Sequence, residues 1–354
     1  MDLGRQWRGG QSQALLAVEG LRSRNHTAEL VALRGSPLAE RARAAGVTVH
    51  EAAPSPALLT AAGVIQKQQR RADFDVVHCH DANGLTAAWI ARAHRRSRVI
   101  ASRRVAYPLS RNPLARARYL SAAKIAAVSR FVADSVTACG IGEDHLAVVY
   151  DGVAVPPLPS PDERAAARAI WNIPIDAPLL GCVGYLLPEK GQDLLIHALP
   201  DILRSRPDAR LLLAGAGPCR PALEELAREL GITGSVVFAG LVPRVETAYA
   251  ALDVFAFPSI AEPLGSSLLA AMAYGTPAVA VGRGAVPEII TDGVDGLLTE
   301  PDPSVFAGAA LRILDDPELA ASLAAAGRER IQTRFSADRM VEDTLDLYRR
   351  VCAR

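Results

Sequence analysis

Short apolar runs alternate with stretches of helical spacing along almost the whole chain of 354 residues, and this alternation limits the fold more than any other feature. It is typical of parallel sheets built from strand–helix–strand units, so the predicted fold class is α/β. In the first half we predict a helix at 12–23 and strands near 28–33, 75–79, 98–102, 125–128 and 146–149. In the second half we predict strands at 179–185, 210–217, 236–241, 254–259 and 277–282.

A proline-rich stretch separates the two runs of strands and helices. Because its four prolines interrupt regular structure, residues 151–163 are predicted to link two domains, and the chain length fits two domains of common size. We predict one α/β domain at 1–155 and a second at 156–335. The final segment, 336–354, has helical spacing and no strand after it, so it is free to pack back on the first domain.

The first strand is expected to be truncated. A glycine loop, Arg8-Gly9-Gly10-Gln11, stands close to the start of the chain, although such loops normally follow a complete strand. Only residues 1–3 are available for that strand. Either further residues precede Met1, or the protein tolerates an incomplete first strand.

Charge is distributed unevenly although the net charge is only +1. Residues 1–155 carry 21 basic against 12 acidic side chains, and residues 156–354 carry 18 against 26. No acid occurs between Asp81 and Asp134, which indicates an anionic partner. We recognise no nucleic-acid module and expect no nucleic acid to bind. An irregular surface segment, 102–120, is predicted to hold an anionic acceptor or membrane surface through Arg103, Arg104, Arg111, Arg116 and Arg118.

The sequence argues against several classes of protein. The five cysteines lie far apart and form no C-x-x-C pair, which argues against a disulfide framework or a zinc site. No apolar run of about 18 residues occurs, and the first ten residues lack the apolar core of a signal peptide. We expect a cytoplasmic protein without a bound metal. The alternative is a protein that binds peripherally to the inner face of the cell membrane.

Two loops suit a phosphate group. Gly9, Gly10 and Gln11 offer backbone N–H groups before a helix, although a double glycine is as often only a tight turn. Lys190 lies between an apolar strand and the start of another helix. A cation at that position is poorly placed for the helix dipole but well placed for a diphosphate.

Two further segments carry polar side chains at strand ends. Glu262 lies in a loop after a strand, where open α/β sheets bind ligands, and Gly265-Ser266-Ser267 then opens an alanine-rich helix. His78 and His80 alternate along a strand, so both point to one side. His80 is nearer the strand end and is the better candidate, although a histidine in such a strand is often structural.

Taken in order, these motifs resemble the retaining GT-B glycosyltransferases of family four, also called glycosyl transferases group 1. The resemblance also includes YDGV at 150–153 and AGAGP at 214–218, and it covers nearly the whole chain. It implies two Rossmann-like domains facing a central cleft, with the acceptor bound by 1–155 and the donor by 156–335. It further implies retaining, hexosyl-type transfer from a nucleotide-diphosphate sugar to an acceptor hydroxyl without a cofactor, in the synthesis of cell-envelope glycolipid, lipopolysaccharide or polysaccharide.

The resemblance also assigns roles to residues. Residues matching His80 and Glu262 lie against the transferred sugar, and these two are the candidate catalytic residues. The residue matching Lys190 grips the donor diphosphate. The candidate donor-binding residues are Gly9, Gly10, Gln11, Tyr185, Lys190, Gly265, Ser266, Ser267 and Ala270.

Two positions depart from the family pattern. Ala270 stands where a second glutamate is usual, and Tyr185 stands where an arginine is usual. Each lost hydrogen bond to a charged group is worth roughly 1.5–3 kcal/mol. Two alternatives therefore stay open: a degenerate GT-B protein that binds a saccharide or a partner without catalysis, and a nucleotide-sugar epimerase of the same fold.

Overall fold

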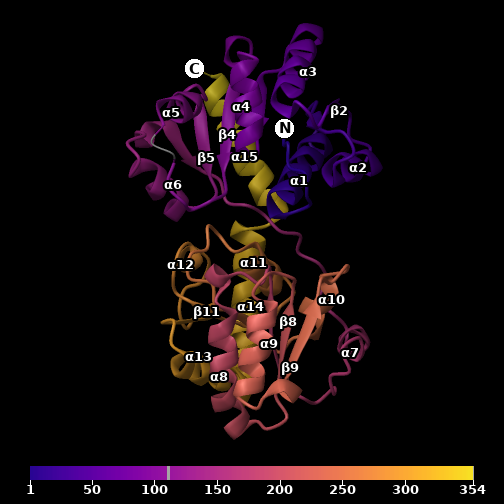
Figure 1. Cartoon of the computed structure of the whole chain (residues 1–354), viewed down its shortest axis with the longest axis vertical. Coiled ribbons are helices and arrows are strands. Elements are labelled where there is room, and N and C mark those ends of the chain that lie inside the picture. The colour runs from indigo at the N-terminus through magenta and orange to yellow at the C-terminus, as the bar shows by residue number, and fades with distance from the viewer. Residues whose placement is uncertain (110–111, 354) are drawn as a thin grey trace. The chain divides into compact units, whose positions relative to one another are not determined.

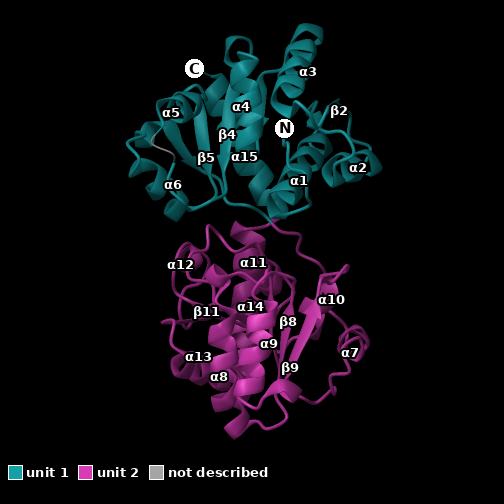
Figure 2. Cartoon of the chain, viewed as in Figure 1, with its two compact units in different colours: residues 1–152, 337–354 teal, residues 153–336 magenta. Residues whose placement is uncertain are grey.

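The protein forms two compact units in a computed structural model that describes residues 1–109 and 112–353 (Figures 1 and 2). Unit 1 comprises Met1–Gly152 together with Ala337–Arg354, and unit 2 comprises Val153–Ser336. In sequence, unit 2 is therefore an insertion within unit 1. Both units are built on parallel sheets, which confirms the predicted α/β class.

Unit 1 contains two parallel sheets. The smaller pairs β1 with β2, and the larger has the order β3-β4-β5-β6. The strands are β1 (Leu30–Leu33), β2 (Val49–Ala52), β3 (Val76–Cys79), β4 (Arg98–Arg103), β5 (Lys124–Ala127) and β6 (Leu146–Val148). All five strands predicted in this half are present. The prediction missed β2, because the sequence VHEA carries two polar residues and has no apolar run.

The helices of unit 1 lie between these strands in sequence, except the first, which precedes β1, and the last, which follows unit 2. They are α1 (Gly9–Ser23), α2 (Pro37–Ala44), α3 (Ala57–Arg71), α4 (Ala82–Ile90), α5 (Pro113–Leu120), α6 (Arg130–Thr137) and α15 (Ala337–Cys352), with single turns η1 (Ala93–Arg95) and η2 (Glu143–His145). Helix α15 covers one face of the larger sheet, where Leu347 and Val351 pack against Ile100 and Ala126. The chain from 337 onward thus supplies part of the core of unit 1.

The first three residues join the two sheets of unit 1. The Asp2 N–H donates to the carbonyl of Val31 in β1 at 3.1 Å. On the other side, the N–H of His80, directly after β3, donates to the Met1 carbonyl at 2.8 Å. Met1 and Leu3 are both buried. Residues 1–3 therefore occupy the position of a short strand between β1 and β3.

Unit 2 contains a six-stranded parallel sheet of order β12-β11-β10-β7-β8-β9. The strands are β7 (Leu179–Val183), β8 (Arg210–Ala214), β9 (Val236–Gly240), β10 (Val254–Phe257), β11 (Ala278–Val281) and β12 (Leu297–Thr299). Strand β10, buried along its whole length, lies between β7 and β11. The five predicted strands are present. The prediction missed β12, which is only three residues long and follows a loop rich in glycine and aspartate.

The helices of unit 2 cover both its sheet and its loops. They are α7 (Pro161–Ala169), α8 (Gln192–Ser205), α9 (Arg220–Glu229), α10 (Glu246–Ala251), α11 (Ser266–Ala273), α12 (Val286–Ile289), α13 (Pro303–Asp315) and α14 (Pro317–Arg334), with single turns η3 (Pro188–Lys190) and η4 (Thr233–Ser235). The prediction that 151–163 is irregular throughout was wrong at its end, because α7 begins at Pro161. Proline fits the first helical position, and Ser160 caps the helix by accepting the Glu163 N–H at 3.2 Å.

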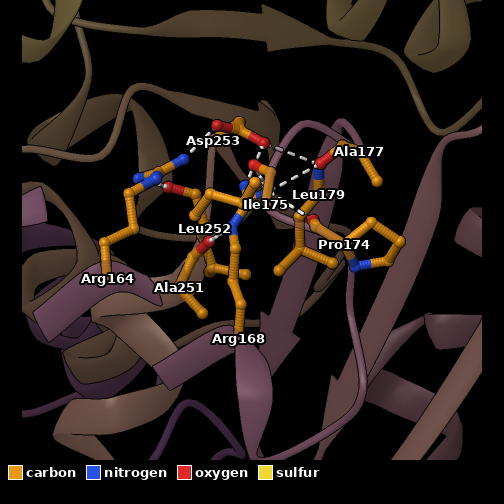
Figure 3. Close-up of polar contacts among 9 residues, drawn as sticks. All are labelled: Arg164, Arg168, Pro174, Ile175, Ala177, Leu179, Ala251, Leu252 and Asp253. Carbon is orange, nitrogen blue, oxygen red and sulfur yellow. Dashed lines mark hydrogen bonds and ion pairs between the residues drawn. The ribbon is translucent and has the colours of Figure 1, made fainter. Parts of the chain in front are cut away.

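Two arginines of α7 bind the amino end of β10 (Figure 3). Asp253, the residue before that strand, accepts hydrogen bonds from Arg168 at 2.6 Å and from the Leu179 N–H at 2.7 Å, and it also pairs with Arg164. Arg168 is 1% exposed, and its other N–H groups donate hydrogen bonds to main-chain carbonyls. Those carbonyls belong to Ala251, Pro174, Ile175 and Ala177.

Candidate functional site

In unit 2, charged side chains meet at the carboxyl end of β10. Lys190 Nζ lies 2.6 Å from Glu262 Oε2, and the Ser259 hydroxyl donates to the same oxygen at 3.0 Å. Glu262 is buried, whereas the Lys190 side chain keeps 29% of its surface exposed. Since an ammonium group has three N–H donors, Lys190 can bind Glu262 and a ligand together. Ser259 was missed by the sequence analysis, although it stands only three residues before Glu262.

Two glycines let neighbouring loops approach this carboxylate closely. A Cβ at Gly284, where φ is +61°, would lie 2.6 Å from the Glu262 carbonyl oxygen. The adjacent Ala285 N–H donates to that same oxygen at 3.0 Å. At Gly191, where φ is +66°, a Cβ would lie 2.6 Å from the Pro258 carbonyl oxygen. Any larger residue would be strained and crowded at either position, so both glycines position the loop that carries Glu262.

The first turn of α11 adds backbone donors beside the same carboxylate. Gly265 is the N-cap of α11, and a Cβ on Gly265 would lie 3.5 Å from Glu262 Cγ. Its φ of +112° favours glycine. As the spacing predicts, Glu262 and the N–H groups at 265–267 lie together. They form an edge of unit 2 that offers one carboxylate, one ammonium and several N–H donors.

The positions that depart from the family pattern also lie near this edge. Ala270 is half-buried on α11, and it shares a helix face with Ser266 and Ser267, which lie one turn earlier. Tyr185 follows β7 and is 44% exposed. Neither side chain supplies the charge that the family pattern has at its position. The charged pair described at this edge is that of Lys190 and Glu262.

In unit 1, two histidines stack at the carboxyl end of β3. The ring centroids of His78 and His80 are 4.2 Å apart, so both side chains lie on one face, as predicted. The two ring nitrogens of His78 lie 2.8 Å from the Tyr348 hydroxyl and 2.8 Å from the Ser102 hydroxyl. Both ring nitrogens of His78 are therefore occupied by contacts within unit 1, and Tyr348 of α15 makes one of these contacts.

His80, unlike His78, makes a described side-chain hydrogen bond through only one of its two ring nitrogens. Its Nδ1 lies 3.3 Å from the Arg104 guanidinium, which also contacts the Asp151 carboxylate at 2.8 and 3.0 Å. Burial holds the pKa of His80 well below its usual value of 6.5, and His78 and Arg104 lower that pKa further. The imidazole is thus neutral at physiological pH. Because a guanidinium only donates, Nδ1 accepts and Nε2 carries the N–H.

Asp151 is a part of this group that the sequence analysis assigned only to a linker. It is 8% exposed, and burial raises the pKa of its carboxyl while the pairing with Arg104 opposes that rise. A cavity of about 10 Å³ adjoins Asp151, Arg104 and both histidines, which is room for about one water molecule. The available signal was the position of the YDGV motif directly after the last strand of the domain.

The glycine loop forms the start of α1. Helix α1 begins at Gly9, and a Cβ at Gly10 would meet no atom within 4 Å, so packing alone does not require glycine there. The Gln11 side chain accepts the Arg8 N–H at 3.2 Å and donates to Asp2 at 2.9 Å. Gln11 is therefore committed to the fold, whereas the backbone N–H groups at Gly9 and Gly10 lie in the first turn, where helix donors lack intrahelical partners.

The predicted basic surface is more ordered than expected. The expectation of an irregular segment was wrong for residues 113–120, which form α5, because Asn112 caps the helix and Pro113 occupies its first turn. The expectation of a surface position was also wrong for Arg103, which is 5% exposed and donates to the Tyr107 carbonyl. Its guanidinium also lies near the rings of Tyr107 and Tyr119, while its buried Nε has no hydrogen-bond partner among the described residues.

The other predicted arginines have separate partners. Arg104 lies in the group with His80 described above. Arg116 donates to the carbonyls of Cys139 at 3.3 Å and Gly140 at 2.5 Å. Arg118 donates to the Thr86 hydroxyl at 2.6 Å. Arg111 lies outside the described residues.

The fold, with candidate binding residues at the carboxyl ends of parallel strands, is that of the GT-B glycosyltransferases, and comparison with known proteins agrees. Residues 163–330 match the family described as glycosyl transferases group 1, and residues 7–155 match glycosyltransferase family 4. The chain belongs to this glycosyltransferase family. Over the described residues, no helix combines the length and apolar character needed to cross a membrane.

Two relatives are similar to this chain over different shares of its length. The D-inositol 3-phosphate glycosyltransferase of Saccharomonospora viridis is 31% identical over 334 residues, covering 85% of this chain and 76% of that protein. A GDP-mannose-dependent alpha-(1-6)-phosphatidylinositol monomannoside mannosyltransferase of Mycolicibacterium smegmatis is 38% identical over 180 residues. That second match covers 48% of this chain and 47% of the relative, so the chain spans about half of that protein.

Solved structures share the fold at low sequence identity. A glycosyltransferase from Rickettsia africae superposes with a TM-score of 0.87 at 19% identity, covering 99% of this chain and 97% of that one. Anabaena Alr3699/HepE, solved in complex with UDP and glucose, superposes with a TM-score of 0.83 at 20% identity, covering 98% and 97%.

Proposed function

We propose that the protein transfers a hexosyl group from a nucleotide-diphosphate sugar to an acceptor hydroxyl, with retention of anomeric configuration. The observation that carries this proposal is the group formed by Lys190, Glu262 and the first turn of α11. An ammonium and several N–H groups suit a diphosphate, and a carboxylate beside them suits sugar hydroxyls. The UDP and glucose bound by the Anabaena protein support a donor of this class.

In this proposal the diphosphate lies against Lys190 and the N–H groups at 265–267. Charge develops on the diphosphate as it leaves, so fixed donors that face it stabilise the transition state. Glu262 binds hydroxyls of the sugar, and its backbone is held by the close approach of Gly284. The N–H groups of Gly9 and Gly10 are proposed as a further phosphate contact. No metal or other cofactor is part of the proposal.

His80 is proposed to lie beside the transferred sugar. Because its imidazole is neutral and Nδ1 faces Arg104, Nε2 has an N–H to donate to a sugar or phosphate oxygen. A neutral donor of this kind fixes orientation without adding positive charge near an electron-poor sugar ring. Arg104 and Asp151 act here as positioning residues for His80.

The acceptor is proposed to be a saccharide or an anionic, lipid-linked molecule in cell-envelope synthesis. The excess of basic residues in unit 1 and the phosphatidylinositol-based acceptor in the name of the mycobacterial relative support this choice. Peripheral contact with an anionic membrane at its cytoplasmic face would then bring enzyme and acceptor together. Cosedimentation with anionic and neutral vesicles tests this part, since specific contact requires stronger binding to the anionic ones.

A second candidate function is binding without catalysis. It is favoured by Ala270 and Tyr185, which replace two charged contacts of the family pattern. Donor binding tests both candidates. UDP-sugars and GDP-sugars are titrated while thermal unfolding is followed, because a ligand at 100 times its Kd stabilises a protein by about 2.7 kcal/mol. Release of nucleoside diphosphate is measured in the same samples.

The proposed transferase requires both stabilisation and release of the nucleoside diphosphate when acceptor is added. Stabilisation without turnover, across acceptor candidates, would support the binding protein instead. No stabilisation by any nucleotide sugar would contradict donor use. Lys67→Ala, on the exposed side of α3, serves as a control lysine variant that should behave like the unmodified protein.

A further inference from the structure

A second cavity lies at the amino end of the larger sheet of unit 1, the edge opposite His80. Its volume is about 430 Å³, and it is lined by the starts of β4 and β5, by β6 and by the last turns of α15. Arg98 and Lys124 are the first residues of β4 and β5. Arg350, from the end of α15, is the third cation in the lining. This volume falls within the range of about 300–1,000 Å³ that is typical of small-molecule sites.

The alternation of strand side chains directs two of these cations toward α15. Arg98 shares a face of the sheet with Ile100, and Lys124 shares it with Ala126, since residues two apart lie on one side. Ile100 and Ala126 pack against Leu347 of α15. Both cations therefore lie on the face that α15 covers, at the end of the sheet, where Arg98 is exposed and Lys124 is half-buried.

The lining of this cavity carries three positive charges. None of the described residues that line it is acidic. Lys124 donates to the main-chain carbonyl of Asp144, and Arg350 Nε donates to the carbonyl of Asp346 at 3.3 Å. Within the described ranges, the Arg98 side chain has no hydrogen bond or ion pair. Three cations held only by carbonyls, or by nothing, favour an anionic ligand.

The remaining lining is apolar. Leu347 and Val351 of α15 form one side of the cavity, and Leu146, Ala147 and Val148 of the edge strand β6 form another. A ligand that fills the cavity must therefore offer apolar surface as well as negative charge. Inorganic anions satisfy only half of this requirement.

This cavity is separate from the candidate site at the other edge of the sheet. Strand β4 runs from Arg98 to Arg103, and Arg104, which contacts His80, follows it. At about 3.3 Å per residue, the two edges are roughly 20 Å apart along the strand. A molecule in the cavity would not occupy the position proposed for the transferred sugar.

We propose that this cavity binds a small amphiphilic anion. Its phosphate or carboxylate lies among Arg98, Lys124 and Arg350, and its apolar part lies against α15 and β6. The site is independent of the proposed transfer reaction, and it is a place where a phosphorylated or carboxylated metabolite can contact the helix that also binds His78 through Tyr348.

Calorimetric titration of the full chain tests the site with hexyl phosphate as the probe, and with inorganic phosphate and hexanol as the two half-probes. We expect one equivalent of hexyl phosphate to bind, inorganic phosphate to bind more weakly and hexanol not to bind measurably. Arg98→Gln and Arg350→Gln should each weaken hexyl phosphate about tenfold or more, because each loses a charged hydrogen bond. Arg95→Gln, an exposed arginine of η1 outside the lining, should bind as the unmodified chain does.

Arg98→Lys keeps the charge and should keep most of the affinity, which separates loss of the site from misfolding. Lys190→Met tests the donor edge as another place for the probe, and it should leave binding unchanged. Equal binding by the unmodified chain and the double variant Arg98→Gln/Arg350→Gln would overturn the proposal. Absence of binding to the unmodified chain, or binding that is lost only in Lys190→Met, would overturn it as well.

Discussion

Strand β10 has an acid at each end, and the two acids lie in different surroundings. Asp253, before the strand, is bound by Arg164, Arg168 and the Leu179 N–H. Glu262, after the strand, is bound by Lys190 and Ser259. The Arg168 side chain is 2% exposed, whereas that of Lys190 is 29% exposed.

The difference distinguishes an ion pair that the fold encloses from one that keeps donors exposed to solvent. Arg168 spends Nε and both terminal nitrogens on protein oxygens, so it has little left to offer a ligand. Among the described residues Lys190 is bound by Glu262, and it has further N–H donors that can turn to solvent. Mutations at the amino end of β10 should therefore mainly lower stability, and mutations at the carboxyl end should mainly lower activity.

The largest effect is expected at the amino end. Arg168→Met should lower the free energy of unfolding by about 3–5 kcal/mol, because it leaves Asp253 with one less cation and leaves several buried carbonyls without a donor. Urea unfolding measures this loss. Arg204→Met, an exposed arginine of α8 paired with Asp201 on the surface, should cost less than about 1 kcal/mol. A cost at Arg168 as small as that at Arg204 would mean that the buried network contributes little.

The carboxyl end should show the reverse pattern. Lys190→Met should reduce kcat/KM for transfer by about 10²–10³-fold, as loss of a transition-state donor does, while lowering the free energy of unfolding by only about 1–2 kcal/mol. Ser259 remains to bind Glu262, and water can enter where the lysine was exposed. Steady-state kinetics and urea unfolding of the same preparation decide the outcome. Near-normal turnover would place the diphosphate contact on another residue.

Gly284→Ala should distort the carboxyl end without removing any polar group. The new methyl group would lie 2.6 Å from the Glu262 carbonyl oxygen, so the loop must shift, and strain at φ of +61° adds about 1–3 kcal/mol. Gly293→Ala is a matched control, since φ there is +72° but no atom lies within 4 Å of the added carbon. Thermal unfolding and donor affinity should both be affected more at 284. Equal effects at the two positions would show strain alone, with no contribution from contact with Glu262.

The carboxylate of Asp81 offers a third case to compare with Asp253 and Glu262. It accepts backbone N–H groups, but within the described residues no arginine or lysine binds it. Asp81 caps α4, and burial, together with the nearby Asp2, raises its pKa to about 6. The pKa of Asp81 in the unfolded chain is about 3.9, so from about pH 4 to pH 6 the folded state holds more protons than the unfolded state. Stability therefore falls as pH rises through that window.

Asp81→Asn keeps Oδ1 as an acceptor and removes the titration. It should be more stable than the unmodified protein by about 2 kcal/mol at pH 7.5, with the difference fading toward pH 4 in urea unfolding. A constant difference at both pH values would show that the charge of Asp81 is not its cause.

The smallest effect is expected at Ala270. If a ribose-containing donor binds along α11, Ala270→Glu should tighten nucleoside diphosphate binding about tenfold, or 1.4 kcal/mol, through hydrogen bonds to the ribose hydroxyls. Calorimetry measures the affinity and thermal unfolding measures stability. Lower stability without tighter binding would indicate a pocket fitted to another ligand, because the new charge would then be buried without a partner.

The sequence predicted those parts of the fold that local patterns encode. Apolar runs located β7 and β10, and the glycine before α11 together with the loop glutamate located the edge that holds Glu262. Strand β2 was missed because its partly buried residues show no apolar pattern. Strands β3 and β6 are also only partly buried, yet their apolar runs predicted them, so the local signal is the apolar run and not the burial of the strand.

Contacts between distant segments could not be predicted in the same way. Arg168 binds carbonyls on two other segments, and nothing in the local sequence distinguishes it from an exposed helix arginine. Arg103 was expected at the surface because its neighbours are basic, yet the Tyr107 carbonyl and tyrosine rings enclose it. Asp151 was assigned to a linker because its partner Arg104 lies on another strand end. Burial of a charge depends on partners that only the folded chain brings together.

The membership of α15 in unit 1 affects the order in which the protein can be completed during synthesis. His78 and its neighbours emerge early, but Tyr348 and the apolar side of α15 leave the ribosome only after the whole of unit 2. At about 5–20 residues per second, unit 1 waits roughly 10 to 40 seconds with one face of its sheet uncovered. Unit 2 has all its residues available by then and can fold first. A truncated product that ends at residue 336 thus carries the whole of unit 2 and an incomplete unit 1, whose uncovered apolar sheet quality control can recognise.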